Sequence, residues 1–64
     1  MEINLTEIVK TWRSRIKLAG KTEPQAAEES GITKGQLSQY LNGKNVPSIA
    51  KFEQFENYLR KLGV

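Results

Sequence analysis

Apolar side chains recur along the chain at intervals of three and four residues, with polar residues between them. In the N-terminal third the apolar positions are Leu5, Ile8, Val9, Trp12, Ile16 and Ala19. In the C-terminal third they are Ile49, Phe52, Phe55, Leu59 and Leu62. This spacing places each set on one side of a helix. No stretch alternates β-branched with polar residues as a half-buried strand would, so the pattern predicts an all-α protein.

Capping signals indicate where the helices begin and end. Thr22 precedes Gln25 with the spacing of a capping box, and Thr33 precedes Gln36 in the same way. Ser48 can cap the last helix, and helix-ending glycines are expected at Gly20, Gly31, Gly43 and Gly63. Asn4 and Glu7 offer another box, with Ile3 packing on Ile8. The signals predict a compact bundle of four helices, or five, with four at about residues 5–19, 23–30, 34–42 and 49–62.

The composition narrows the functions that such a bundle can serve. With 64 residues, the chain is expected to form a single domain over residues 1–64. It has no cysteine and no histidine, so thiolate sites and the side chain best suited to proton transfer near neutral pH are missing. No nucleophile–base pair or phosphate loop is present either. We therefore expect no enzyme activity, no metal, no cofactor and no small-molecule substrate.

Charge and hydropathy point to a partner in solution. No apolar run approaches the roughly 20 residues that span a bilayer. The N-terminus has an acid at Glu2 and no extended apolar core, so a signal peptide and membrane binding are not expected. Residues 1–22 carry five basic and two acidic side chains, within a net charge of +3 for the whole chain. This basic excess is compatible with a polyanionic partner, and we expect a cytoplasmic protein.

Two short expected helices, about 23–30 and 34–42, are joined by only Gly31, Ile32 and Thr33. A connection this short, starting with glycine, makes the second helix leave at a steep angle to the first. Small residues in the first helix would let the two approach closely, while Ile32 and Leu37 fill the space beneath the turn. This is the geometry of a helix-turn-helix, here over about residues 23–42, whose second helix enters the DNA major groove.

The run QAAEESGITKGQLSQYLNGK, residues 25–44, resembles the helix-turn-helix of the lambda-repressor-like (Cro/repressor, XRE-type) family of phage and bacterial regulators. The matching features are Ala27, Gly31, Ile32, Leu37 and the closing LNGK of residues 41–44. The segment TKGQLSQY, residues 33–40, is also similar to the recognition segment of phage CII-type activators. Two residues depart from the family pattern. Ser30 replaces a usually apolar residue, and Glu23 replaces a polar residue that commonly contacts a phosphate.

Helical geometry predicts which residues of the second helix read bases. Successive residues turn by about 100°, so with Leu37 inward, Gly35, Gln39 and Asn42 lie opposite it, and no carboxylate lies among them. Glutamine can pair with adenine N6 and N7, and lysine can reach guanine O6 and N7. Glycine at position 35 would let the helix backbone sit deep in the groove, and the alternative explanation is that glycine near a helix start costs the helix little. The expected base-reading residues are Lys34, Gly35, Gln36, Ser38 and Gln39.

Further residues are candidates for the DNA backbone and for a dimer contact. Glu23 would be repelled by DNA, so the free N–H groups at that helix start and its other polar neighbours are better phosphate ligands. After the second helix, the resemblance implies phosphate contacts by the loop. The expected phosphate-binding residues are Lys21, Thr22, Gln25, Thr33, Asn42, Lys44 and Asn45. The candidates for a dimer contact, partly off the main stripe of the last helix, are Tyr58, Leu62 and Val64. The basic residues of the first helix, Arg13, Arg15 and Lys17, are expected to be solvated, and the alternative is that some of them contact the DNA backbone.

These features predict a sequence-specific double-stranded DNA-binding transcriptional regulator of the phage or prophage Cro/repressor type. It would bind an operator as a homodimer, in a bacterial cell or a phage-infected host. Two alternatives stay open from the sequence. One is a CII-like transcription activator, and the other is an antitoxin-type or protein-binding helix-turn-helix module.

Overall fold

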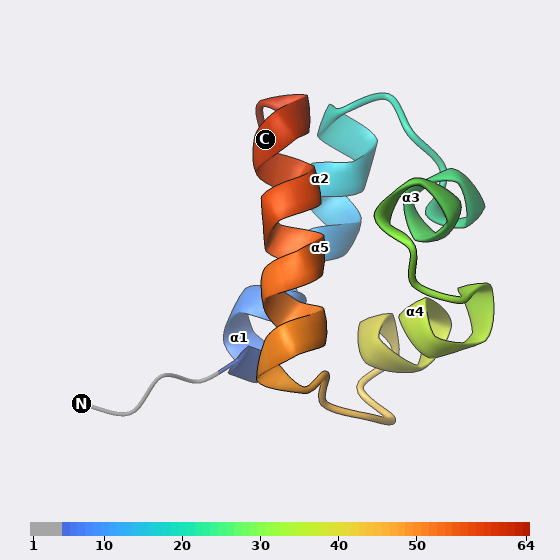
Figure 1. Cartoon of the computed structure of the whole chain (residues 1–64), viewed down its shortest axis with the longest axis vertical. Coiled ribbons are helices and arrows are strands. Elements are labelled where there is room, and N and C mark those ends of the chain that lie inside the picture. Colours follow the sequence, from blue (N-terminus) through green and yellow to red (C-terminus); the bar gives the residue numbers. More distant parts are fainter. Residues whose placement is uncertain (1–4) are drawn as a thin grey trace.

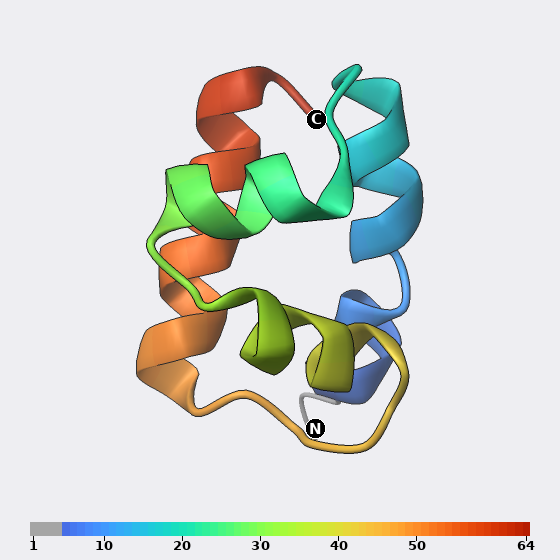
Figure 2. The same cartoon turned by 90° about the vertical axis from the view of Figure 1, so that its right-hand side faces the viewer.

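The computed structural model describes residues 5–64, so the cap expected at Asn4 and the contact expected of Ile3 lie outside the described residues. Within this range the chain forms α1 (Leu5–Val9), α2 (Trp12–Leu18), α3 (Glu23–Ser30), α4 (Lys34–Leu41) and α5 (Ile49–Leu62). The described residues include no strand, which confirms the all-α prediction. Helices α3 and α4 form one layer, and they lie across the layer formed by α1, α2 and α5 (Figures 1 and 2). None of these helices is long and apolar enough to cross a membrane.

The prediction of one continuous helix over residues 5–19 is wrong, because the chain bends at Lys10 and Thr11. The Thr11 backbone N–H donates to the Ile8 carbonyl at 2.9 Å, three residues back instead of four. The Thr11 hydroxyl donates to the same carbonyl at 2.7 Å. Such side-chain bonds compete with the helical ladder and bend helices. As a result α1 turns away from the axis of α2 (Figure 1).

The predicted caps form at the starts of three helices. Thr22 and Gln25 make a complete capping box at α3. The Thr33 hydroxyl accepts from the Gln36 backbone N–H at 3.2 Å, whereas the Gln36 side chain makes no return bond to any described residue. The Ser48 hydroxyl accepts from the backbone N–H of Lys51 at the start of α5. The start of α4 therefore keeps one glutamine side chain that the fold does not use.

Gly31 ends α3 in a conformation that a larger residue would strain. Its φ is +82°, in the left-handed region that favours glycine. A Cβ atom there would lie 2.9 Å from Nε2 of Gln54, which donates a hydrogen bond to the Ser30 carbonyl from α5. The turn between α3 and α4 thus depends on this glycine for its backbone angle, whereas the amide of Gln54 lies at the end of a flexible side chain and can shift.

The core lies between the two layers and is built around Trp12. Its ring packs against Phe52 and Phe55 of α5, with ring centroids 5.7 Å and 4.5 Å away. Leu37 of α4 is fully buried in the same cluster. This packing anchors α4 to the body of the protein by one side only. The largest fully buried side chains are Trp12, Phe55, Ile16, Leu37 and Leu59.

Arg15 is not solvated as expected, because it joins α2 to the end of α5. Its Nη1 donates to both carboxylate oxygens of Glu56 at 2.7 and 2.8 Å. Its Nη2 donates to the backbone carbonyl of Val64 at 2.9 Å. The side chains of Arg15 and Glu56 are only 20% and 10% exposed. The expectation was wrong because the partners lie far away in the sequence, where no local pattern indicates them.

Candidate nucleic-acid interface

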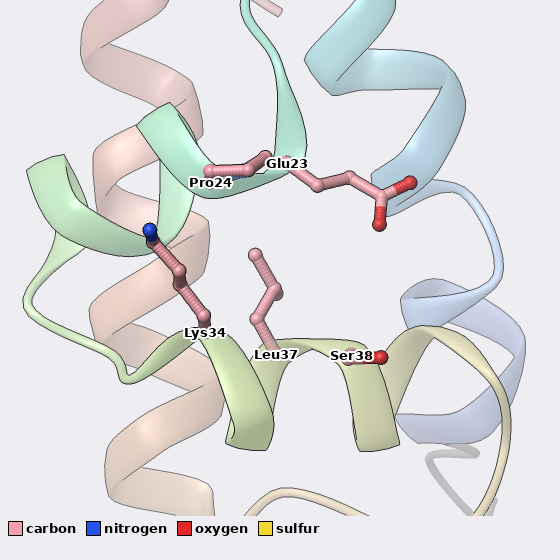
Figure 3. A pocket seen from close by; sticks show the side chains of 5 residues that line it. All are labelled: Glu23, Pro24, Lys34, Leu37 and Ser38. Carbon is pink, nitrogen blue, oxygen red and sulfur yellow. The ribbon is translucent and has the colours of Figure 1, made fainter.

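Helices α3 and α4 and the three residues between them form the face turned to the viewer in Figure 2. Ala26 and Ala27 are completely buried, so the small side chains allow the helices to approach as predicted. Leu37 points from α4 toward α3 (Figure 3), and Ile32 is buried beneath the turn. Above Leu37 a hollow of about 200 Å³ remains between the helices, with Glu23, Pro24, Lys34 and Ser38 around it. The two short helices, joined by three residues and packed against each other, form the helix-turn-helix expected from the sequence.

The structure brings the five predicted base-reading residues together on α4. Lys34, Gly35, Gln36, Ser38 and Gln39 are all exposed, while Leu37 and Tyr40 are buried. Lys34 is turned aside from the rest, since its ammonium group points toward α3 (Figure 3). From Lys34 to Asn45 the sequence contains no carboxylate side chain. A face of this kind offers amide, hydroxyl and ammonium groups to a ligand and no negative charge.

Nothing inside the described protein requires glycine at position 35. A Cβ atom built on Gly35 would meet no atom within 4 Å. Its backbone also lies outside the positive-φ region that the other four glycines adopt. Glycine inside a helix is less favourable than alanine by about 0.5–1 kcal/mol. The fold therefore gains nothing from the missing side chain.

The loop after α4 is tied back to the outer face of the helix. The side-chain amide of Asn45 donates to Oε1 of Gln39. The backbone N–H of Lys44 donates to the carbonyl of Gln39 at 2.9 Å. Two predicted phosphate-binding residues, Lys44 and Asn45, therefore lie beside a predicted base-reading residue, and both are exposed. Sequence reasoning assigned these residues separately and missed the bond between Gln39 and Asn45.

A chain of hydrogen bonds that the sequence did not indicate joins α2, α3 and α4. Arg13 of α2 donates from Nε to Oε2 of Glu23 at 3.1 Å and from Nη2 to Oδ1 of Asn42 at 3.4 Å. Asn42 in turn donates from Nδ2 to the Ser38 hydroxyl at 3.3 Å. Arg13 is thus not simply solvated as expected. No sequence signal finds this arrangement, because the partners lie on three different helices.

The polar residues predicted to bind phosphate at the start of α3 already have partners within the protein. Lys21 pairs with Glu29 across 3.3 Å. Thr22 and Gln25 bond to each other in the capping box. Thr33 caps α4 through its hydroxyl. Beyond α4, Asn42 and Asn45 also have partners, whereas the side chain of Lys44 has none among the described residues. All seven of these candidates are exposed except Lys21, which is partly buried.

Glu29 also links α3 to α5. It accepts a hydrogen bond of 2.6 Å from the Tyr58 hydroxyl. Burial, followed by this bond to a carboxylate, raises the pKa of Tyr58 to about 12. The bond from Tyr58, followed by the one from Lys21, lowers the pKa of Glu29. Both shifts favour the protonated tyrosine beside the ionised glutamate.

The three residues predicted for a dimer contact have roles within the single chain. Tyr58, Leu62 and Val64 are partly buried and pack against the core. The large apolar residues that are most exposed lie elsewhere, namely Leu18, Val46 and Ile49. Packing on the core accounts for the apolar character of the three candidates. A dimer contact through them stays a prediction.

Comparison with known proteins gives a family match over most of the chain. The model of the family described as Helix-turn-helix matches residues 13–62. Two proteins called trifunctional NAD biosynthesis/regulator protein NadR, from Salmonella typhimurium (strain LT2) and Escherichia coli (strain K12), are each 46% identical to this chain over 48 residues. That alignment covers 73% of this chain and 12% of each relative, so the chain spans only a small part of their length. No solved structure gives a significant match.

Proposed function

Since this chain belongs to the XRE-type helix-turn-helix family, we propose that it is a sequence-specific double-stranded DNA-binding transcriptional regulator of the phage or prophage Cro/repressor type. The observation that carries the proposal is the outer face of α4. Its polar side chains are exposed and free of carboxylates, and the space in front of Gly35 is open. A helix held to its body by one buried side, with such an outer side, fits a major groove.

Within this proposal α4 reads base edges. Gln36 and Gln39 pair with adenine, Lys34 swings outward to guanine, and Ser38 bonds to either. Gly35 removes the side chain that would hold the helix backbone away from the groove. The outer face of α4 carries the exposed polar residues expected from the sequence. The Gln36 side chain has no bond within the described protein, which supports a role for it in binding a base.

Phosphate contacts supply position and most of the affinity. The exposed residues beyond α4, Asn42, Lys44 and Asn45, make these contacts on one flank of the helix. The start of α3 supplies backbone N–H groups beside Thr22 and Gln25, and Thr33 adds a contact at the start of α4. Lys21 binds a phosphate only when its ion pair with Glu29 breaks, because the two side chains are paired in the free protein.

The regulator acts as a homodimer on its operator, with Tyr58, Leu62 and Val64 at the contact. Its two half-sites then lie about one helical turn, roughly 34 Å, apart. Residues 1–64 form one DNA-binding domain that acts in the cytoplasm of a bacterial cell or a phage-infected host. The NAD biosynthesis named for the relatives is not transferred, because the alignment covers 12% of each of them.

Selection of bound fragments from random duplex DNA tests the proposal. The expected result is one enriched sequence, present as an inverted repeat with half-sites about one turn apart. Absence of enrichment, together with no gel shift even at low salt, would favour the antitoxin-type or protein-binding alternative. A reporter with the selected site placed either across or upstream of a promoter separates repression from CII-like activation.

Gln39→Ala tests the assignment of the reading face. It should cost about 1–3 kcal/mol at the selected site and leave binding to random duplex nearly intact, because the lost contact is to a base. Asn45→Ala is the comparison variant, since it removes the same Gln39–Asn45 bond and keeps the glutamine. Because Asn45 is itself proposed to bind phosphate, this variant should weaken binding to both duplexes by the same factor, unlike Gln39→Ala. Lys44→Ala should weaken binding to both duplexes and reduce the salt slope by about 1 for each protomer bound. An equal loss on random DNA for Gln39→Ala would contradict its role.

A further inference from the structure

An acid stands at the first position of α3, within the surface assigned to DNA. Glu23 is 43% exposed in its side chain, and its carboxylate points toward α2 and away from Lys34 (Figure 3). Alone, it would repel the DNA backbone. Arg13 neutralises it, with Nε 3.1 Å from Oε2. The DNA would therefore meet an ion pair at this place and not a bare carboxylate.

Two contacts fix the guanidinium of Arg13 and leave part of it open. Nε is held by Glu23 and Nη2 by Asn42, whereas Nη1 makes no hydrogen bond with any described residue. The guanidinium is planar and rigid, so holding two of its nitrogens also sets the direction of the third. The Arg13 side chain is 51% exposed. An amino group that is oriented and open in this way suits a phosphate oxygen.

The surroundings of the pair are basic. A hollow of about 360 Å³ lies between α2 and the start of α3, and Arg13, Lys17, Lys21 and Glu23 stand around it. Lys21 is already paired with Glu29, but Lys17 has no ion pair among residues 5–64. Arg13, Lys17 and Lys21 against Glu23 and Glu29 leave a local charge of 3 − 2 = +1, which attracts a phosphate. Asn42 places the same guanidinium beside the end of α4.

We propose that Arg13 binds a phosphate of the DNA backbone through Nη1, and that Glu23 is a positioning residue that holds the guanidinium for this contact. The inference rests on the proposed function, since it adds a cation from α2 to the same DNA-binding surface. Glu23 then has two opposite effects on DNA. It repels phosphate by its charge and favours binding by orienting Arg13.

A double-mutant cycle separates the two effects. Arg13→Gln, Glu23→Gln and the double variant are titrated with the selected duplex and with random duplex over a range of salt concentrations. For each protomer bound, Arg13→Gln should weaken binding to both duplexes by about fivefold at physiological salt and reduce the salt slope by about 1. Glu23→Gln should give no gain in the wild-type background. In the Arg13→Gln background it should strengthen binding severalfold, because only the repulsion remains to be removed.

The matched control is Arg60→Gln, which removes one exposed cation from α5. Arg60 borders a separate hollow with Ile8 and Phe52, between α1 and α5. Its substitution should change the slope less than Arg13→Gln does. Thermal unfolding checks that the variants fold, and exposed ion pairs contribute little to folding.

The outcomes distinguish this inference from the proposed function. A wild-type protein with no salt-dependent affinity for either duplex would overturn the proposed function itself. Where the wild type binds, Arg13→Gln with the slope of Arg60→Gln would overturn only the phosphate contact. Glu23→Gln strengthening binding by the same factor in both backgrounds would overturn its positioning role.

Discussion

Arg13 and Arg15 stand two residues apart on α2, and each pairs with a glutamate, yet the two pairs have different surroundings. Arg15 reaches inward to Glu56 of α5, and both side chains are mostly buried. Arg13 reaches outward to Glu23 of α3, and both side chains are about half exposed. Helix α2 thus directs one arginine inward against α5 and the other outward beside α3 and α4.

The difference lies in what each pair can do. A buried pair has lost its water, so removing one partner leaves an uncompensated charge. An exposed pair keeps its water and contributes only about 0–1 kcal/mol to folding. Arg15 with Glu56 therefore holds the fold, whereas Arg13 with Glu23 remains available to a ligand. The following changes test that division.

The largest expected effect is on the inner pair. Arg15→Met leaves Glu56 buried without its partner and should lower the free energy of unfolding by about 3 kcal/mol. Urea-induced unfolding measures the loss. Arg13→Gln, the matched control in the outer pair, should cost less than about 1 kcal/mol. In the Arg15→Met/Glu56→Met double variant most of this loss should be recovered, because no buried charge is left unpaired. Equal losses for Arg15→Met and Arg13→Gln would contradict the distinction between a structural inner pair and an available outer pair.

Two glycines differ in whether the fold needs them, since Gly31 has a positive φ and Gly35 does not. Gly35→Ala should raise the free energy of unfolding by about 0.5–1 kcal/mol, because alanine favours the helix and its Cβ meets open space. Gly31→Ala should lower it, because φ is +82° and alanine is strained in that region, and because the amide of Gln54 would have to shift. Unfolding curves measure both changes.

DNA binding should change in the opposite sense at position 35. The stabilised Gly35→Ala protein is expected to bind the selected site more weakly, and Gly35→Leu more weakly still, since each added group holds α4 away from the groove. Titration of the folded variants with the selected duplex measures this. A Gly35→Leu protein that folds and keeps full affinity would show that DNA does not explain the glycine.

The smallest expected effect on stability concerns the hydrogen bond between Tyr58, which is partly buried, and Glu29, which is exposed. The folded pKa of Tyr58, about 12, lies above its ordinary 10.0, so its contribution to stability is complete below pH 10 and is lost as the pH rises through about 12. The pKa of Glu29 lies below 4.5, so its contribution is present above that pH and is lost as the pH falls through the folded value.

Spectroscopic titration measures this, with Tyr58→Phe subtracted to isolate the signal of Tyr58. Its midpoint should lie near pH 12. Glu29→Gln should move the midpoint only part of the way toward 10.0, because burial is the larger cause and stays. A midpoint near 10.0 in the wild-type protein would show that neither the burial of Tyr58 nor its bond to Glu29 is maintained in solution.

Much of the candidate surface follows from the sequence, because helix periodicity assigns faces. With Leu37 placed inward, the exposure of Gln36, Ser38 and Gln39 was predicted correctly. The sequence did not indicate that Gln39 is bonded to Asn45, or that Lys21 is held by Glu29. Those pairings depend on which rotamer each side chain adopts against its neighbours, and periodicity contains no such information.

By itself the sequence determined the all-α class, both ends of α3, the start of α4 and the outer face of α4. Caps, helix-ending glycines and apolar stripes depend on residues within about four positions of one another, so they can be recognised in the sequence. Only the tertiary structure decided that Arg15 pairs with Glu56 of α5, whereas Arg13 contacts Glu23 of α3 and Asn42 after α4. Their partners are 41 and 10 residues away along the chain, and they meet only because packing around Trp12 fixes how the two layers cross.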